Sequence, residues 1–184
     1  MTGTQKFTTA RLVARSWRAD DLPFATELWG DPAVMALIDA RGQLTAAQVE
    51  EKLRAEIDRE CSDGVQYWAL FNRSDGEFVG CCGLRRWIYT PDEANFELGF
   101  HIVKRCWGTG FAIEAASGAL DHGWRQMRLS KVYAGHHPDN RASRHILERL
   151  GFKFLETVLY EPTGLMHPSY VCKRPETVSV PDGP

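Results

Sequence analysis

The sequence predicts one α/β domain of the α+β type, in which helices pack on a mixed β-sheet. The first observation is size and composition: 184 residues, 43% of them hydrophobic and 25% charged, are enough for one substantial core. The second is the order of the periodic segments, which runs from helices through three strands and then alternates helix and strand. The third is the lack of internal repeats and low-complexity blocks in the sequence.

The chain before the predicted strands reads as one strand followed by helices. Weak alternation at 10–17 predicts an early strand. Acidic residues followed by a tolerated proline indicate helical structure within 18–38. Thr45 and Gln48 have the spacing of a capping box, and the apolar residues after them predict a helix that ends before 61–64.

A β-rich region comes next. Segments 65–71 and 77–87 read as strands, and the polar stretch between them has the residues of a hairpin turn. In the third strand, 93–103, alternate residues are apolar, so the strand has one apolar face and one face that carries Glu97 and His101. Gly99 interrupts this strand and predicts a bulge.

The rest of the chain alternates helix and strand. A helix begins at Phe111 with small and apolar residues on one side, and 131–137 reads as a strand. A short helix follows within 138–150, and Gly151 stands where a helix stop is expected. Two closing strands are expected at 152–160 and 166–174.

Charge and cysteine usage exclude several function classes. A net charge of −2 makes a nucleic-acid partner or an anionic membrane surface unattractive, and no apolar stretch has the length of a membrane span. The five cysteines are scattered without a C-x-x-C pair, which favours small buried hydrophobes over disulfides or metal ligands. The adjacent His136 and His137 would face opposite ways on a strand, so we expect no metal site. We expect a soluble cytoplasmic protein.

The stretch RCWGTGFA, residues 105–112, is the first candidate functional motif. Gly108 and Gly110 would let the backbone approach a ligand, and the helix after them would present unpaired amides. No Walker or dinucleotide pattern accompanies them. By itself the loop is compatible with a structural turn and with phosphate binding.

A second motif lies in the later short helix. Asn140 precedes a stripe of Ser143, Ile146, Leu147 and Leu150. A serine on an otherwise apolar stripe indicates a polar role, whereas Asn140 could equally be the helix N-cap. Both interpretations stay open at this point.

Together the two motifs resemble the GNAT superfamily of acetyl-CoA-dependent N-acetyltransferases. The likeness rests on Arg105, Gly108, Gly110, Phe111 and Ala112, followed by NRASRHILERLGF at 140–152. The segment ELGFHIVKRCWGTGFAIEA and the early ARLVARSWRADDL are most similar to the ribosomal-protein N-terminal (Rim-type) branch. The resemblance implies a mixed, strongly bent sheet of about seven strands flanked by helices and splayed between the fourth and fifth.

The resemblance also implies where acetyl-CoA binds. The loop and helix start would hold the pyrophosphate, the strand edge would hold pantetheine, Asn140 would bind its arm, and Ser143 would lie near the sulfur. The implied cofactor-binding residues are Phe100, His101, Ile102, Val103, Arg105, Trp107, Gly108, Thr109, Gly110, Phe111, Ala112, Asn140 and Ser143.

Three side chains are candidates for catalysis. Glu97 is the first candidate for the general base that removes a proton from the amine, and His101 is the second. Glu97 could alternatively be a structural carboxylate, and His101 a wall residue. Many family members carry a Tyr as general acid where this chain has Leu147, so Ser143 is the remaining candidate proton donor.

The acceptor end is the least determined. Four aromatic residues could line it: Trp29, Trp87, Tyr89 and Tyr160. Acidic residues in the early helices would suit a cationic acceptor, but they equally suit a solvated face; they are Asp31, Asp39, Glu50 and Glu51.

These features predict an enzyme that acetylates a primary amine, either a small molecule or a protein N-terminus. The alternative is a non-catalytic acyl-CoA-binding or sensory module. The domain is expected at 8–174, between an N-terminal extension at 1–7 and a flexible tail at 175–184, as a monomer or homodimer.

Overall fold

In a computed structural model, residues 3–86 and 95–176 form one sheet with helices on both faces. The eight strands lie in the order β1-β2-β3-β4-β5-β6-β8-β7, and every adjacent pair is antiparallel except β5–β6. The strands are β1 Gln5–Thr8, β2 Leu12–Arg15, β3 Tyr67–Asn72, β4 Phe78–Arg86, β5 Phe96–Ile102, β6 Lys131–Gly135, β7 Lys153–Tyr160 and β8 Leu165–Lys173. The predicted mixed α/β architecture is confirmed.

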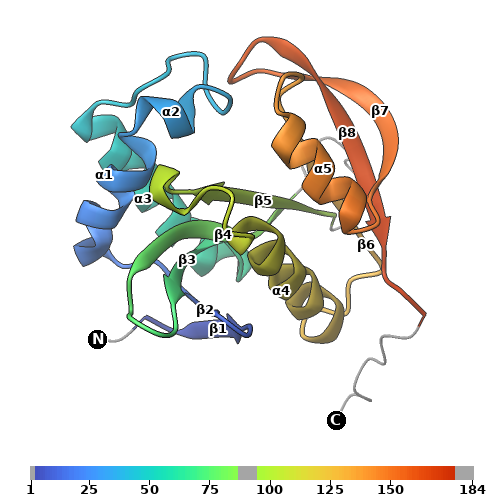
Figure 1. The fold of residues 1–184 in the computed structure, drawn as a ribbon, viewed down its shortest axis with the longest axis horizontal. Helices are drawn as coiled ribbons and strands as arrows, with labels where there is room; N and C mark the ends of the chain where they lie inside the picture. Colours follow the sequence, from blue (N-terminus) through green and yellow to red (C-terminus); the bar gives the residue numbers. More distant parts are fainter. Residues whose placement is uncertain (1–2, 87–94, 177–184) are drawn as a thin grey trace.

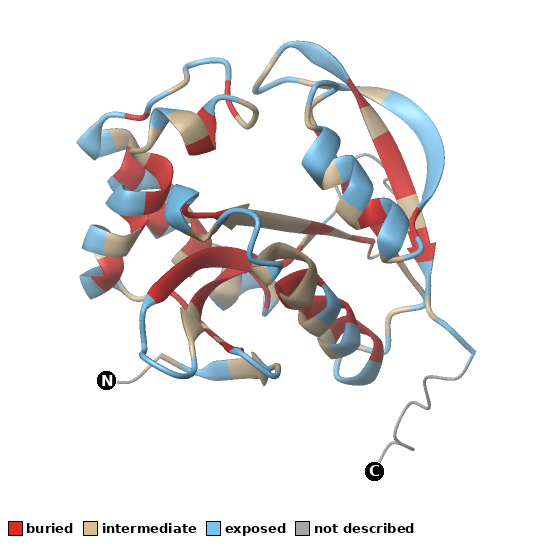
Figure 2. Ribbon diagram, in the orientation of Figure 1, coloured by how far each residue is buried: buried red, intermediate tan, exposed pale blue. Residues whose placement is uncertain are grey.

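The helices divide between the two faces of the sheet (Figure 1). The α-helices are α1 Leu22–Trp29, α2 Pro32–Met35, α3 Ala46–Asp63, α4 Phe111–Arg125 and α5 Arg141–Arg149. Two short 3₁₀ turns precede α1 and α4: η1 Ala19–Asp21 and η2 Lys104–Cys106. One apolar core packs α4 and α5 against the sheet, while a second packs α1, α2 and α3 against the opposite face. Figure 2 shows the buried residues concentrated along the strands and the inner sides of the helices.

Local sequence signals explain most of these elements, but α3 is longer than predicted. The capping box of Thr45 and Gln48 is present in both directions. The helix does not end before residue 61: it continues through Asp63, and Gly64 closes it in the left-handed conformation at φ +72°. Gly64 is the first residue there that adopts this backbone without strain, so the helix extends to it.

The sheet begins earlier than predicted. Gln5–Thr8 pair with β2, so part of the expected N-terminal extension at 1–7 belongs to the domain, and the sheet has eight strands rather than about seven. Phe7 packs on the core, and its ring lies 5.9 Å from that of Trp68. This one apolar side chain in a polar stretch is too short a signal to predict a strand.

The prediction of a bulge in β5 is wrong. Pairing with β4 runs without a shift from Arg86↔Phe96 to Gly80↔Ile102. Glycine is needed at position 99 for another reason. A Cβ there would lie 2.2 Å from the Tyr67 ring, so only a residue without a side chain leaves room for that ring. On its other edge β5 is registered with β6 only at Glu97↔Tyr133, which agrees with the expected splay.

Cys81 and Cys82 lie on opposite faces of β4 and both are buried, as their adjacency predicts. Cys61 is exposed, contrary to the prediction of buried thiols. All five cysteines are free thiols.

Within the described residues, no helix combines the length and the apolar character needed to cross a bilayer.

Candidate functional site

A cavity of about 140 Å³ opens where β5 and β6 diverge. Its walls come from α3, β3, β4 and β5 on one side, and from α5, β7, β8 and the segment after β6 on the other. Of the predicted site residues, five line it: Glu97, Phe100, His101, Asn140 and Ser143. Residues distant in the sequence are therefore brought together as expected.

Glu97 is a carboxylate in an environment that favours its protonated form. The Tyr67 hydroxyl donates a 3.0 Å hydrogen bond to Glu97 Oε1. Burial raises the pKa of Glu97 above its ordinary value, although the charge of Arg85 and the bond from Tyr67 act in the opposite direction. A carboxyl whose pKa is raised toward neutrality is suited to accept and release a proton.

His101 is held in one tautomer by its neighbour. Trp29 Nε1 lies 3.1 Å from His101 Nδ1, and because an indole nitrogen can only donate, Nδ1 must accept. Burial, followed by the charges of Lys52 and Arg85, lowers the pKa of His101 well below its ordinary value. The ring is therefore neutral, with its proton on Nε2, and offers a donor rather than a free base.

Sequence reasoning missed the two cations of the cavity. Arg85 lies on the Tyr67 ring, 3.6 Å from its centroid, and pairs with the fully buried Glu56. Lys52 Nζ lies over the Trp29 ring, 5.3 Å from its centroid. Burial and the charge of Arg85 lower the pKa of Lys52 to about 8. In the sequence both residues resemble ordinary surface cations, and only the packing of α3 and β4 reveals them.

His167 and Tyr160 reach the cavity from the β7–β8 hairpin. Thr163 Oγ1 lies 2.8 Å from His167 Nε2, and the rings of Tyr160 and His167 are 4.7 Å apart. Burial, then the charges of His137 and His136, lowers the pKa of His167 to about 4. Tyr160 was an expected lining residue; His167 was not, because nothing in its local sequence marks it.

The glycine loop has the backbone of an anion-binding site. Gly108 and Gly110 have φ of +75° and +83°, a conformation that favours glycine. In the described part of the chain, none of the amides of 108–113 has a hydrogen-bond partner, and α4 has no side-chain cap. Free amides at the positive end of a helix bind phosphate oxygens.

The loop is anchored from the opposite end of the chain. Arg11 donates to Thr109 O at 3.1 Å, pairs with Glu114 at 2.6 Å, and lies over the Phe111 ring. Thr109 Oγ1 also donates to Cys106 O at 2.7 Å. Sequence analysis did not connect Arg11 with the loop, since the two are far apart in the chain.

The predicted cofactor residues on β5 are not equivalent. Val103 N donates to Val79 O at 3.0 Å, and because the register has no shift, odd-numbered residues of β5 bond to β4. His101 and Val103 therefore lack free backbone groups on the cleft side. The Ile102 carbonyl accepts from Trp107 Nε1 at 2.8 Å. Phe100 has a free backbone edge facing the divergence of β5 from β6.

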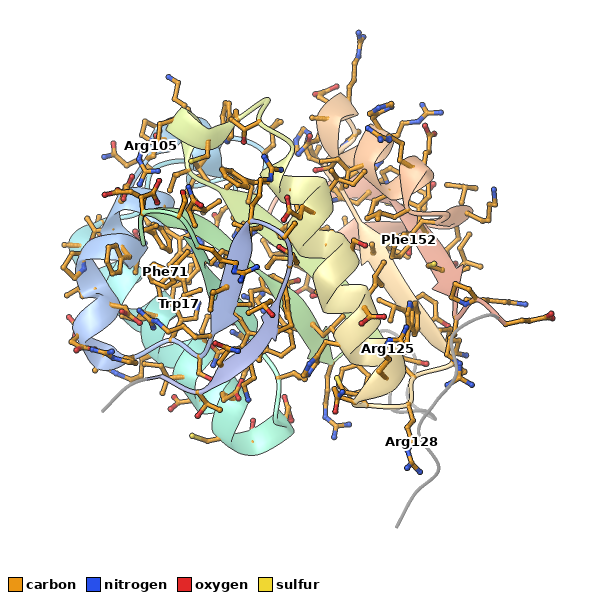
Figure 3. The ribbon with its side chains drawn as sticks, turned by 60° about the horizontal axis from the view of Figure 1, so that its bottom comes forward. Trp17, Phe71, Arg105, Arg125, Arg128 and Phe152 are labelled. Atoms are coloured by element: carbon orange, nitrogen blue, oxygen red, sulfur yellow. The ribbon has the colours of Figure 1, made fainter. Side chains whose placement is uncertain are left out.

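Arg105 points away from the helix start of α4. Its guanidinium bonds to Phe78 O at 2.7 Å and to Glu27 at 3.1 Å, and Figure 3 shows it beside α1. It therefore tethers the turn before the loop to α1 and β4. The expected phosphate-binding role at the rim has no geometric support.

Asn140 is the N-cap of α5, since its side-chain oxygen accepts from Ser143 N at 3.0 Å. The capping interpretation is confirmed. The residue also lines the cavity, so capping and ligand contact are compatible. Ser143 follows on the cavity side of α5, with Leu147 buried behind it.

Comparison with known proteins decides the family. The family model described as "Acetyltransferase (GNAT) domain" matches residues 11–153. The chain belongs to the GNAT acetyltransferase family. It is therefore an acetyl-CoA-dependent acetyltransferase, with acetyl-CoA as co-substrate.

The relatives include a ribosomal-protein N-acetyltransferase. The chain is 30% identical over 131 residues to the uncharacterized protein YkkB of Bacillus subtilis, covering 71% of this chain and 74% of that protein. It is 28% identical over 87 residues to the [ribosomal protein uS5]-alanine N-acetyltransferase of Escherichia coli, covering 47% and 44%. The structure of Mycobacterium smegmatis RimJ in complex with CoA-disulfide superposes with a TM-score of 0.75 at 17% identity, covering 97% and 89%.

The geometry of this GNAT acetyltransferase fits acetyl-CoA. The free amides of 108–113 suit its pyrophosphate, and the free edge of Phe100 suits the amides of pantetheine, as an added strand would. The interior of the cavity beyond that edge carries Glu97 and Ser143.

The expectations for the acceptor end are mixed. Trp29 is fully buried and contacts the site through His101 and Lys52, while Trp87 and Tyr89 lie outside the described residues. None of the four acidic residues of the early helices lines the cavity. Three of them bind neighbouring groups: Asp31 caps α2, Asp39 pairs with Arg41 and Glu50 pairs with Arg54.

Proposed function

We propose that this enzyme transfers the acetyl group of acetyl-CoA to a primary amine by direct attack within a ternary complex. The observation that carries the proposal is Glu97: a carboxyl with a raised pKa lines the same cavity as the free backbone edge of Phe100. Acetyl-CoA supplies an acetyl group on a thioester, which an amine attacks only after losing its extra proton. A nearby base whose pKa is raised above that of an ordinary carboxyl is therefore the one side chain the reaction needs most.

Glu97 is the proposed general base. Its bond from Tyr67 orients the carboxylate, and Gly99 leaves the space that the Tyr67 ring occupies. We assign no proton-accepting role to His101, because its Nδ1 already accepts from Trp29. The Nε2–H of His101 is instead available as a donor to a polar group of the acceptor.

The Phe100 amide and Ser143 have supporting roles in this proposal. The Phe100 N–H points into the divergence of the strands and would stabilise charge that develops on a carbonyl oxygen. Ser143 would return a proton to the departing sulfur. Because a thiolate leaves readily near neutral pH, the contribution of Ser143 is modest.

The acceptor is a small-molecule amine or a protein N-terminus. The uS5-alanine N-acetyltransferase of Escherichia coli favours the second, but that likeness covers less than half of either chain. The alternative function, a non-catalytic acyl-CoA-binding module, is favoured only by Leu147, which stands where many family members carry a catalytic Tyr.

One experiment separates these functions. Release of free CoA thiol is followed colorimetrically with acetyl-CoA and a panel of amines and N-terminal peptides, and acetyl-CoA binding is measured in parallel by calorimetry. We expect binding together with amine-dependent thiol release. Binding without release by any amine would identify a sensory module, and the absence of binding would contradict the whole assignment.

A further inference from the structure

We propose that the acceptor of this enzyme carries a carboxylate, and that Lys52 of α3 binds it. The inference rests on the proposed amine acetylation and adds the chemical class of the substrate. It follows from one unpaired ammonium group in the wall of the reaction cavity.

Lys52 lines the cavity without a carboxylate partner among the described residues. Asp39, whose negative charge acts on Lys52, is already bound twice by Arg41, at 2.9 and 2.6 Å. Only the face of Trp29 accompanies the ammonium. A half-buried lysine without a counter-ion is uncommon, because desolvation of its charge is costly.

The other charges of this region are accounted for. Glu56 takes both Arg85 and Arg59 as partners and also accepts from Tyr67 N at 2.9 Å. Among the described residues, Glu97 is the single carboxyl that lines the cavity, and the Tyr67 hydroxyl donates a hydrogen bond to it. Against that one carboxyl, the cavity presents Lys52 and Arg85. The cavity therefore has a surplus of positive charge that an anionic ligand would neutralise.

The surplus persists at neutral pH. Burial and Arg85 lower the pKa of Lys52 to about 8, with smaller influences from Cys81, Arg59 and Asp39, so the group is mostly protonated at pH 7. Histidines cannot act as counter-ions to Lys52, because an imidazole is either neutral or positively charged; burial lowers the pKa values of His101, His136 and His167, which favours their neutral forms. A bound carboxylate would give Lys52 the partner that it lacks.

Lys52 and Glu97 enter the cavity from different elements, α3 and β5. An acceptor that presents its amine to Glu97 and its carboxylate to Lys52 would be held at two points. The same chemistry could come from a free amino acid or from a peptide N-terminus followed by an acidic side chain. A polyamine would instead place a second cation against Lys52 and Arg85.

The test uses matched pairs of amines. The first pair is methionine and methioninamide; the second is Ala-Asp-amide and Ala-Asn-amide. Thiol release gives kcat/KM for each with wild type, Lys52→Met and Lys52→Arg. Methioninamide contains more neutral amine at a given pH because it lacks the carboxylate that stabilises the ammonium. A preference for methionine therefore cannot arise from amine protonation.

We expect wild type to prefer the acid of at least one pair by roughly ten- to a hundredfold, the range of a charge-assisted hydrogen bond. Lys52→Met should abolish this preference through a rise in KM for the acid while the rate with the amide is kept. Lys52→Arg should retain most of it, and Lys173→Met, an exposed lysine of β8, should match wild type. The pair that shows the preference identifies the source of the carboxylate.

Other outcomes overturn the inference. Equal use of acid and amide by wild type, or an equal loss of both in Lys52→Met, would exclude carboxylate recognition by Lys52 and leave amine acetylation standing. If none of the amines supported thiol release, the proposed function and this inference would both be wrong. Circular dichroism of each variant confirms that the fold is retained.

Discussion

The loop at 107–112 and the cavity at Glu97, which we propose as the two ends of one site, are built in opposite ways. The loop is exposed, and its working groups are backbone amides presented by two glycines and a helix start. The cavity lies between the two diverging strands, and its candidate working groups are side chains from several separate strands and helices. In the proposed enzyme, backbone groups of the loop would bind acetyl-CoA, whereas recognition of the acceptor would depend on particular side chains of the cavity.

The loop and the cavity also differ in the free energy that desolvation of their polar groups costs. Free amides at a helix end stay solvated until a ligand arrives, so the loop needs only its conformation and its anchor at Arg11. Charged side chains in the cavity lose much of their hydration, so each one shifts its pKa or requires a partner. Mutations should consequently affect the loop through affinity and the cavity through rate and pH dependence.

The largest effect is expected for Glu97→Gln. Loss of the base should reduce kcat about 10²- to 10⁴-fold, while calorimetry shows unchanged acetyl-CoA affinity. Glu51→Gln changes an exposed carboxylate of α3 outside the cavity and should have wild-type kinetics. A wild-type rate for Glu97→Gln would instead mean that water or another group removes the proton.

An intermediate effect is expected for Gly108→Ala. A left-handed backbone costs a non-glycine residue about 1–2 kcal/mol, so the loop should relax and raise KM for acetyl-CoA roughly tenfold. Gly164→Ala is the matched control: its φ is +68°, and at both glycines an added Cβ would meet nothing within 4 Å. Both variants should lose similar stability, but Gly164→Ala should keep its KM. If both variants kept it, the loop conformation would not matter for binding.

The smallest effect is expected for Tyr67→Phe, measured as the pH dependence of kcat/KM. Burial raises the pKa of Glu97, so activity is lost as pH falls through a value above the ordinary one. The Tyr67 hydrogen bond favours the carboxylate; removing it should raise the pKa further and move the acid limb upward by roughly one unit. The value of kcat/KM on the plateau above this pH range should change by less than about threefold.

Tyr170→Phe serves as the control for that experiment. It removes a hydroxyl that lies 3.3 Å from His136 Nε2, so the acid limb should stay where it is in wild type. A Tyr67→Phe profile that coincides with wild type would show that Glu97 does not control the acid limb.

The sequence was most informative where function depends on local backbone. Glycines before a small-residue helix, and an asparagine at a helix start, have the same local meaning in any fold, so the loop and Asn140 could be predicted. It was less informative for β5. Gly99 was predicted to mark a bulge, but its cause is the ring of Tyr67 on a neighbouring region of the sheet. Local patterns carry no information about such a contact.

The sequence by itself determined the family, the mixed α/β architecture, the glycine loop and the candidacy of Glu97, because motif order and periodicity depend on residues near one another in the chain. Only the tertiary structure decided that Arg105 binds α1, that His101 has its acceptor nitrogen occupied, and that Lys52 has no carboxylate partner within 3–86 and 95–176. Each of these follows from a partner distant in sequence, and pairing and desolvation exist only once the chain has folded.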